Sequence, residues 1–324
     1  MEKFNQFRDR GSGISPFLPV VTPNTTVSNF VGAWAFMLRL PLLVTYCVVY
    51  FLVLDYLPLP QLLRKLQLWT MLAIPGIWWV DLQLDGVKRG SLSQQPASRL
   101  PRERAVIAAQ FTSPVDAVYL AAIFDPIFVA SYPGTREVQR VSLFRAVCLA
   151  LAPPTASFPR KGLTTISALL EQNPRRIIAV FPEMTTTNGK GILPLSPSLL
   201  SCPADVNIFP VSLRYTPGDI TTPVPGAWIS FMWNLFSRPT HLIKVRVAEG
   251  VSNTTVATNG LHHEDMEKTT PRVNDTRYSL PPEQQRFLDH IADTLARLAR
   301  NKRVGLTVED KAAFAEAIVK KKNR

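Results

Sequence analysis

Ala105-Val106-Ile107-Ala108-Ala109 stands directly before Gln110 and the motif Phe111-Thr112-Ser113-Pro114-Val115-Asp116. The five apolar residues predict a short buried strand, and residues 116–124 predict a helix. The motif therefore lies where a buried strand gives way to a helix. In open α/β sheets, the carboxyl end of a strand is where functional sites are found.

A second motif, Phe181-Pro182-Glu183-Met184-Thr185-Thr186-Thr187-Asn188-Gly189-Lys190, has the same setting. Residues 176–181 predict the strand that leads into it, and Asn188-Gly189 predicts a tight turn that presents backbone donors. Because both motifs begin where a predicted strand ends, we expect them to face one crevice. An ordinary polar loop after a strand would explain the second motif equally well.

The rest of the central region alternates between predicted strands and helices. We expect further strands at residues 80–84, 127–130, 207–215 and 242–248, and helices at 137–151 and 163–172. This alternation predicts an α/β domain over residues 80–250, with a mainly parallel central sheet flanked by helices.

An N-terminal segment, residues 1–29, precedes an apolar region that we expect to meet a membrane, residues 30–80. Within it, residues 30–54 carry one charge, Arg39, and are long enough to span a bilayer. Residues 66–80 contain three tryptophans but are broken by Pro75-Gly76. A buried core helix followed by a strand remains the alternative there, and a span or an in-plane anchor both remain open.

The C-terminal part is predicted to contain a linker, residues 251–280, and then helices with a basic tail, residues 281–324. Thr307-Val308-Glu309-Asp310 fits a capping box that opens the last helix. Lys321 and Lys322 occupy the positions of a dilysine retrieval signal, although a frayed basic tail would look the same.

Composition narrows the class of partner. The chain has 324 residues, with 36 Lys and Arg against 24 Asp and Glu, which gives a net charge of +12. That surplus suits a phospholipid surface or a phosphorylated substrate, and the sequence contains no nucleic-acid-binding motif. Three widely spaced cysteines argue against a disulfide framework or a metal site.

The two motifs resemble the signature of the glycerolipid acyltransferase family. In that family the first motif reads His, four residues, Asp; here Phe111 occupies the His position. The second resembles the family's Glu-Gly-Thr, with Met184 in place of Gly. The first nineteen residues resemble those of a fungal branch of the same family, in which the residue before Thr-Ser-Pro-x-Asp need not be His.

The resemblance implies a set of site residues. Asp116 is expected to be catalytic, by organising the thioester end of the site, although a plain helix cap would also explain it. Arg160 is expected to contact phosphate, because a guanidinium matches phosphate oxygens; a surface charge is the alternative. The residues expected to bind substrate are Ser113, Arg160, Glu183, Thr185 and Gly189.

The resemblance also implies an activity: a membrane-bound enzyme that transfers an acyl chain from acyl-CoA to a lysophospholipid, with lysophosphatidate as the expected acceptor. Acyl-CoA would be a co-substrate, with no bound cofactor and no metal. Membrane lipids are the expected partners, and protein partners are not indicated. The expected location is the endoplasmic reticulum membrane or lipid droplets, with the active domain in the cytosol. A catalytically impaired, lipid-binding pseudoenzyme of the same fold is the alternative, because Phe111 removes the usual base.

Overall fold

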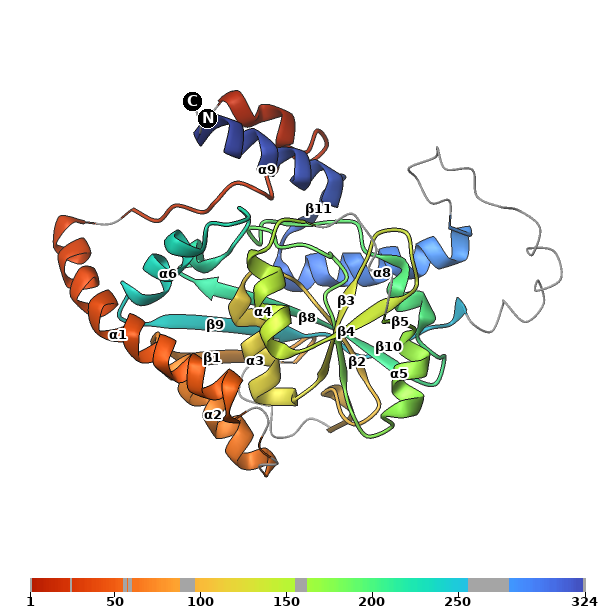
Figure 1. The fold of residues 1–324 in the computed structure, drawn as a ribbon. Helices are drawn as coiled ribbons and strands as arrows, with labels where there is room; N and C mark the ends of the chain where they lie inside the picture. The colour runs from red at the N-terminus through yellow and green to blue at the C-terminus, as the bar shows by residue number, and fades with distance from the viewer. Residues whose placement is uncertain are drawn as a thin grey trace.

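The computed structural model describes residues 2–23, 25–54, 57, 60–87, 97–154, 162–255 and 280–322. Its centre is a nine-stranded sheet in the order β1-β9-β8-β2-β6-β3-β4-β5, with β10 beside β8 (Figure 1). The strands are β1 (Ile77–Leu84), β2 (Val106–Ala109), β3 (Ile127–Ser131), β4 (Val138–Val141), β5 (Leu163–Thr164), β6 (Ile178–Val180), β8 (Asn207–Thr216), β9 (His241–Val247) and β10 (Val251–Ser252).

The middle of the sheet is parallel and its flanks are mixed. β8, β2, β6 and β3 run in the same direction, and the register pairs Ile107 of β2 with Ala179 and Phe209 on either side. β4 and β5 continue one edge antiparallel, while β9 pairs antiparallel with β8 and parallel with β1. The expected α/β class with helices on both faces is confirmed, with antiparallel strands added outside the parallel centre.

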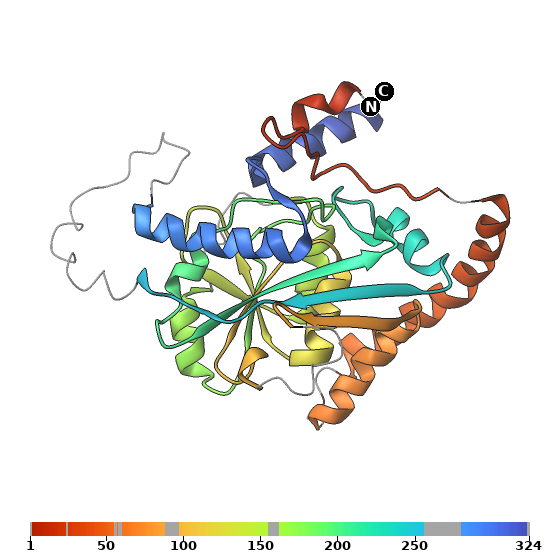
Figure 2. The same cartoon turned by 180° about the vertical axis from the view of Figure 1, so that it is seen from behind.

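Alternate residues of the central strands enter two separate cores, as the period of a strand requires. Ile107 and Ala109 join the core under one set of helices, whereas Val106 and Ala108 join the core on the other face. The first face carries α2 (Gln61–Ala73), α3 (Pro114–Phe124), α4 (Leu143–Leu151) and α6 (Trp228–Phe236). The opposite face carries α5 (Ile166–Gln172) and α8 (Pro282–Ala299), as Figure 2 shows for α8.

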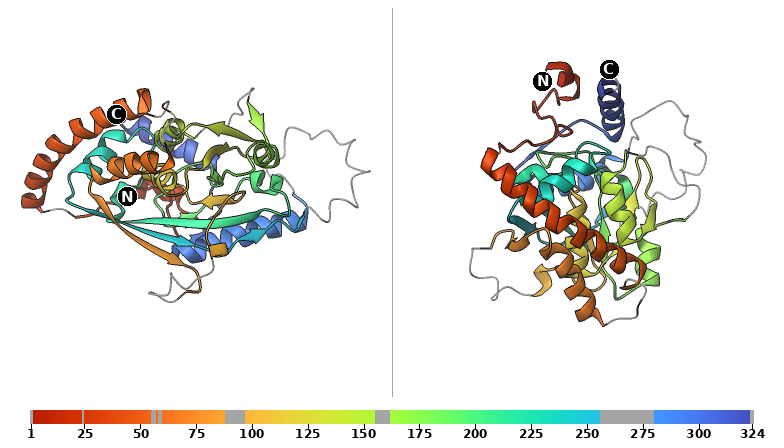
Figure 3. Two further views of the ribbon diagram at one scale, coloured as in Figure 1. Left: turned by 90° about the horizontal axis from the view of Figure 1, so that it is seen from below. Right: turned by 60° about the vertical axis from the view of Figure 1, so that its left-hand side comes forward.

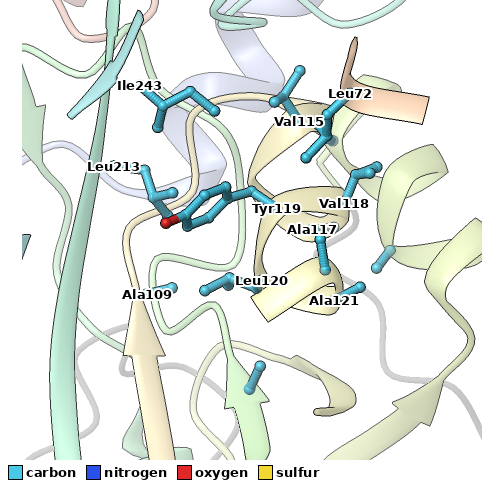
Figure 4. Close-up of a cluster of buried hydrophobic side chains, with 14 of the residues drawn as sticks. Leu72, Ala109, Val115, Ala117, Val118, Tyr119, Leu120, Ala121, Leu213 and Ile243 are labelled. Atoms are coloured by element: carbon cyan, nitrogen blue, oxygen red, sulfur yellow. The ribbon is translucent and has the colours of Figure 1, made fainter. Parts of the chain in front are cut away.

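Helix α3 is the helix that the first motif opens, and it is apolar almost all round. Tyr119 and Leu120 point from it toward Ala109 and Leu213 of the sheet, while Val118 lies on its outer side (Figure 4). A helix that is hydrophobic on every side belongs in a core. Here α2 and α4 cover the sides that the sheet leaves open.

Two predicted helices begin later than expected. Residues 138–141 form β4 rather than the first turn of a helix, because Val138 and Val141 face the core while β3 pairs with their backbone. Likewise Leu163–Thr164 pairs with β4 before α5 begins. Each helix starts only after a cap, Ser142 or Thr165, whose side chain accepts a backbone N–H.

The first apolar segment forms α1 (Thr26–Leu52), which is long and apolar enough to cross a membrane by length and composition. It lies along the outside of the domain (Figure 3). Arg39 donates to the carbonyl oxygens of Arg238 and Pro239, and Gly32 lies so close to Ser237 that a Cβ would sit 2.9 Å from its carbonyl oxygen. The second segment forms the end of α2, the turn at Pro75-Gly76 and the start of β1, that is, a helix followed by a strand. Leu68 and Leu72 are buried, whereas Trp78 and Trp79 are exposed.

The two ends of the described chain meet. A short N-terminal helix, η1 (Glu2–Phe7), lies beside α9 (Val308–Lys322) above the sheet (Figures 1 and 2). Phe7, Phe17 and Phe314 form a third, small core between them. We call this unit, residues 2–23 and 302–322, the terminal cap. It also contains β11 (Lys302–Arg303), which pairs with β7 (Gly191–Ile192) directly after the second motif. Most of the predicted linker, residues 256–279, lies outside the described residues.

Candidate active site

The two motifs meet at the carboxyl ends of two neighbouring parallel strands, β2 and β6. The N–H of Thr187 donates to the carbonyl oxygen of Phe111 over 3.1 Å, and the N–H of Phe111 donates to Glu183 Oε1 over 3.3 Å. The rings of Phe111 and Phe181 are stacked with centroids 4.3 Å apart. The expectation that both motifs face one crevice therefore agrees with the structure.

A cavity of about 220 Å³ opens beside this junction. Phe111 and Phe181 form an apolar side, and Thr185 adds a hydroxyl from the second motif. Arg145 of α4 supplies a positive charge at the wall. The remaining lining residues are Val129, Ala130, Ser131, Tyr132, Val141, Ala146, Leu149, Ala152, Pro153, Pro154 and Met184.

Asp116 lies beneath the first motif and is fully buried. Its Oδ2 accepts the backbone N–H groups of Thr112 and Ser113 over 2.7 and 2.8 Å, and its Oδ1 accepts the Tyr215 hydroxyl. Burial raises the pKa of this carboxyl to about 6, against the lowering effect of these donors, so it is mostly ionised at neutral pH. The structure thus places the expected catalytic carboxylate in a capping box that opens α3.

Ser113 is the N-cap of α3 and does not line the cavity. Its Oγ accepts the N–H of Val115 over 3.3 Å and donates to the carbonyl oxygen of Ile220 over 2.9 Å. The first motif is therefore shaped by bonds within six consecutive residues, together with bonds to the second motif, to β8 and to the loop after β8.

Glu183 is also fully buried, but it bridges separate segments of the chain. Its two oxygens accept the N–H groups of Phe111 and Leu193 over 3.3 and 3.1 Å. Burial raises its pKa to about 8, and the nearby Asp116 adds to that rise. In this conformation Glu183 joins the second motif to the first and to the strand after it.

Met184 occupies a backbone position that suits glycine. Its φ is +61°, in the left-handed region where a side chain crowds the backbone. This is the position at which the family resemblance leads one to expect Gly. Thr185, the next residue, lines the cavity, and Gly189 later in the loop also has a positive φ of +70°.

The second motif is held by residues from both ends of the chain. Asn188 Nδ2 donates to the carbonyl oxygens of Ser15 and Leu18, each over 2.8 Å. From the other end, Asn301 donates to the carbonyl oxygen of Gly189. Gly189 thus contacts a protein side chain where the sequence predicts a substrate contact.

Lys311 of α9 was not indicated by the sequence analysis. It is fully buried, and its Nζ donates to the carbonyl oxygen and hydroxyl of Thr186 over 2.6 and 2.9 Å. Burial lowers its pKa to about 7, while Glu183 acts in the opposite direction. In sequence, Lys311 looks like any other lysine near a basic tail, and no local pattern marks it. The sequence analysis also missed Tyr215 and Arg145, because no local sequence pattern marks either residue.

The remaining candidates to place are Arg160, the predicted phosphate contact, and the histidines of the chain. Arg160 is within residues 155–161, outside the described part of the chain, as are His262 and His263. His241 is buried at the start of β9 with Nε2 2.8 Å from the carbonyl oxygen of Leu235, and burial lowers its pKa. Among the described residues, no cluster of His, Cys, Asp and Glu has a metal-binding arrangement.

Comparison with known proteins shows which proteins the chain is similar to. No protein-family model matches the chain. It is 26% identical over 257 residues to a putative lysophosphatidic acid:oleoyl-CoA acyltransferase of Schizosaccharomyces pombe, covering 76% of this chain and 83% of that protein. It is also 26% identical over 202 residues to lysophosphatidic acid:oleoyl-CoA acyltransferase 1 of Saccharomyces cerevisiae, covering 60% of this chain and 61% of that protein.

Among solved structures, the 1-acyl-sn-glycerophosphate acyltransferase PlsC of Thermotoga maritima aligns with a TM-score of 0.40 and 13% identity, covering 84% of this chain and 96% of that one. The resemblance drawn from the motifs is confirmed by the two fungal relatives rather than by this alignment. The chain is a homologue of these fungal acyltransferases, and that likeness supports its resemblance to the glycerolipid acyltransferase family.

Proposed function

We propose that this protein is a membrane-bound O-acyltransferase that moves an acyl chain from acyl-CoA to lysophosphatidate. The observation that carries the proposal is the convergence of Phe111 and Thr185, one from each motif, on a single cavity with Arg145 at its wall. The names of the two fungal relatives supply the acceptor and the donor.

The reaction needs an acceptor hydroxyl placed against a thioester carbonyl. The hydroxyl oxygen bonds to the acyl carbon, the carbon–sulfur bond breaks, and the hydroxyl proton ends on the coenzyme A sulfur. Arg145 is suited to hold the phosphate of the acceptor, because a guanidinium pairs with phosphate oxygens. Pro154 lines the cavity and precedes Arg160 by six positions in the sequence, and we propose that Arg160 assists.

Phe111 replaces the base that would remove the hydroxyl proton. General-base catalysis contributes roughly 10²–10⁴-fold, whereas holding two reactants in line contributes more. We therefore propose an enzyme that works mainly by positioning. Asp116 and Glu183 would contribute by fixing the backbone of the two motifs around the substrates.

Membrane attachment is proposed from the surface of α1 and its neighbours. Large apolar side chains are exposed along α1, on α2, on β1 and at the start of α6, where Trp228 and Ile229 are 56% and 64% exposed. Exposed tryptophans suit the headgroup region of a bilayer, and the net charge of +12 suits an anionic surface. The endoplasmic reticulum or a lipid droplet would supply such a surface next to acyl-CoA.

The pseudoenzyme remains a second candidate for one reason. Phe111 is 3% exposed and stacked on Phe181, so the apolar replacement is built into the packing. A lipid-binding protein of this fold would keep the cavity but would not catalyse acyl transfer.

Purified full-length protein in detergent, given labelled oleoyl-CoA and lysophosphatidate, separates the two candidates. We expect transfer of label to phosphatidate, with heat-treated protein as the blank. Arg145→Met should raise the KM for lysophosphatidate by about tenfold, whereas the control Arg140→Met, on β4 outside this cavity, should not. No transfer above the blank, with lysophosphatidate still bound, would establish the pseudoenzyme.

A further inference from the structure

A second and larger cavity lies between the terminal cap and α6. It has a volume of about 800 Å³ and a mainly apolar wall. Phe4, Leu18 and Val20 line it from the N-terminal segment, and Phe314 and Ile318 line it from α9. It shares no lining residue with the cavity at Phe111.

One wall of this cavity carries a buried carboxylate. The side chain of Asp219 is 4% exposed, and its Oδ2 accepts Arg238 Nε over 2.9 Å as well as the hydroxyl of Thr22. Its backbone carbonyl accepts Asn234 Nδ2 over 2.8 Å. Arg238 thus balances the negative charge of Asp219 by pairing with Oδ2.

The other carboxylate oxygen, Asp219 Oδ1, is buried and has no hydrogen-bond partner among the described residues. A buried acceptor without a donor costs free energy, and a donor that reaches it forms a bond to a charged group. Because Arg238 already balances the charge, an uncharged hydroxyl is the better match than a second cation.

One wall of the cavity adjoins the surface that we propose to face lipid. Ala227 and Ser230 line the cavity, and between them Trp228 and Ile229 are exposed. The N-terminal segment that forms the opposite wall leads into α1. A lipid chain at that surface would therefore lie close to the cavity wall.

We propose that this cavity binds a single-chain lipid whose polar end carries an uncharged hydroxyl, with the chain along the apolar wall and the hydroxyl donating to Asp219 Oδ1. This site is separate from the acyl-transfer site, and the proposal does not rest on acyl transfer. It accounts for the apolar wall, for the unpartnered carboxylate oxygen and for the position of the cavity beside exposed Trp228 and Ile229.

The ligand test compares two probes that differ only in the donor: oleyl alcohol and its methyl ether. Binding to the full-length protein is measured in one detergent, at equal mole fractions in the micelle. We expect the alcohol to bind at least about tenfold more tightly, which is the effect of one hydrogen bond to a charged acceptor. Equal binding of alcohol and ether would overturn the assignment.

The location test uses substitutions in the wall. Ser230 lines the cavity, so Ser230→Trp should fill part of it and reduce alcohol binding at least about tenfold. The control Gln172→Trp, at an exposed position on α5, should leave alcohol binding unchanged. A photoreactive oleyl alcohol should label residues 18–21 and 223–231. Unchanged binding by Ser230→Trp, or labelling only near Phe111, would show that the cavity is not the site.

Asp219→Asn tests the carboxylate itself. Arg238 would hold the amide oxygen and turn the amide nitrogen toward the cavity, where alcohol and ether oxygens accept equally well. We expect the preference for alcohol over ether to disappear. A preference that persists in a folded Asn variant would exclude Asp219; if the variant melts early, the wild-type probe pair and Ser230→Trp still decide the question.

Discussion

The two motif loops are built in opposite ways. The loop from Phe111 to Asp116 is fixed by its own capping box and by bonds to the body of the domain, at Tyr215 and in the loop after β8. The loop from Phe181 to Lys190 depends on Ser15, Leu18, Asn301 and Lys311, which lie far away in sequence. The first loop should therefore keep its shape when the terminal cap is disturbed, and the second should not.

The most damaging change to the first loop is Asp116→Ala. Two backbone N–H groups and the Tyr215 hydroxyl would lose a buried acceptor, at about 1–3 kcal/mol each, so we expect a loss of roughly 5 kcal/mol. Thermal unfolding in detergent measures it. Asp116→Asn keeps one acceptor and should lose less; equal losses would contradict this account of the cap.

The matching change to the terminal cap is Phe314→Ala. Phe314 is fully buried among Phe4, Phe7 and Phe17, so its removal should cost about 3–5 kcal/mol. Hydrogen exchange should rise at residues 186–190 and stay unchanged at residues 112–116. Equal exchange in both loops would show that they unfold as one unit.

Phe111→His restores the base that the family resemblance leads one to expect. If positioning alone now drives the proposed transfer, turnover should rise about 10²-fold, equivalent to about 2.7 kcal/mol of barrier. Initial rates with labelled oleoyl-CoA measure it. Phe111→Tyr, an aromatic control, should give no gain, and a His variant that folds without a gain would place the limiting step elsewhere.

Lys311→Met tests the bond between the cap and Thr186. Burial lowers the pKa of Lys311 to about 7 from 10.5, so its contribution to stability grows as pH rises between those values. The difference in free energy of unfolding between wild type and variant should widen from pH 7 to pH 9.5, by about 2–3 kcal/mol in total.

Lys311 lowers the pKa of Glu183, so removing the lysine should raise that pKa further, and the difference between the two proteins reports on the pair. Lys320→Met, at an exposed position of the same helix, is the control that removes a lysine without removing a buried bond. A pH-independent gap for Lys311→Met would mean that this amine does not titrate there.

The smallest effect is expected at Met184. Glycine adopts a φ of +61° without strain, so Met184→Gly should stabilise the second loop by about 1 kcal/mol. Thr185→Gly, one residue further, should destabilise instead. A loss of stability at Met184→Gly would mean that the Met side chain stabilises the loop by more than the backbone strain costs.

The sequence predicted the elements that depend on residues close together in the chain. The strand into Phe111, the helix after it and the capping box of α9 follow from neighbouring residues, and the structure contains all three. Residues 138–141 were predicted as helix because their strand character comes from pairing with β3, which no local pattern reveals.

The candidate site shows the same difference between contacts that the local sequence predicts and contacts that it does not. That Phe111 and Glu183 adjoin could be expected from the parallel strands before them. The contacts of Tyr215 with Asp116 and of Lys311 with Thr186 could not, because each joins residues about a hundred positions apart. The roles of Ser113, Thr185, Gly189 and Arg160 in substrate binding stay predictions.

The contact of Lys311 with Thr186 also determines when the second loop can form during synthesis. During synthesis, the residues of both motifs leave the ribosome before α9 exists. At about 5–20 residues per second, on the order of ten seconds pass between the emergence of Thr186 and that of Lys311. Over that interval the nascent chain can complete its sheet but not its second loop, so its competence to bind substrate would arrive last.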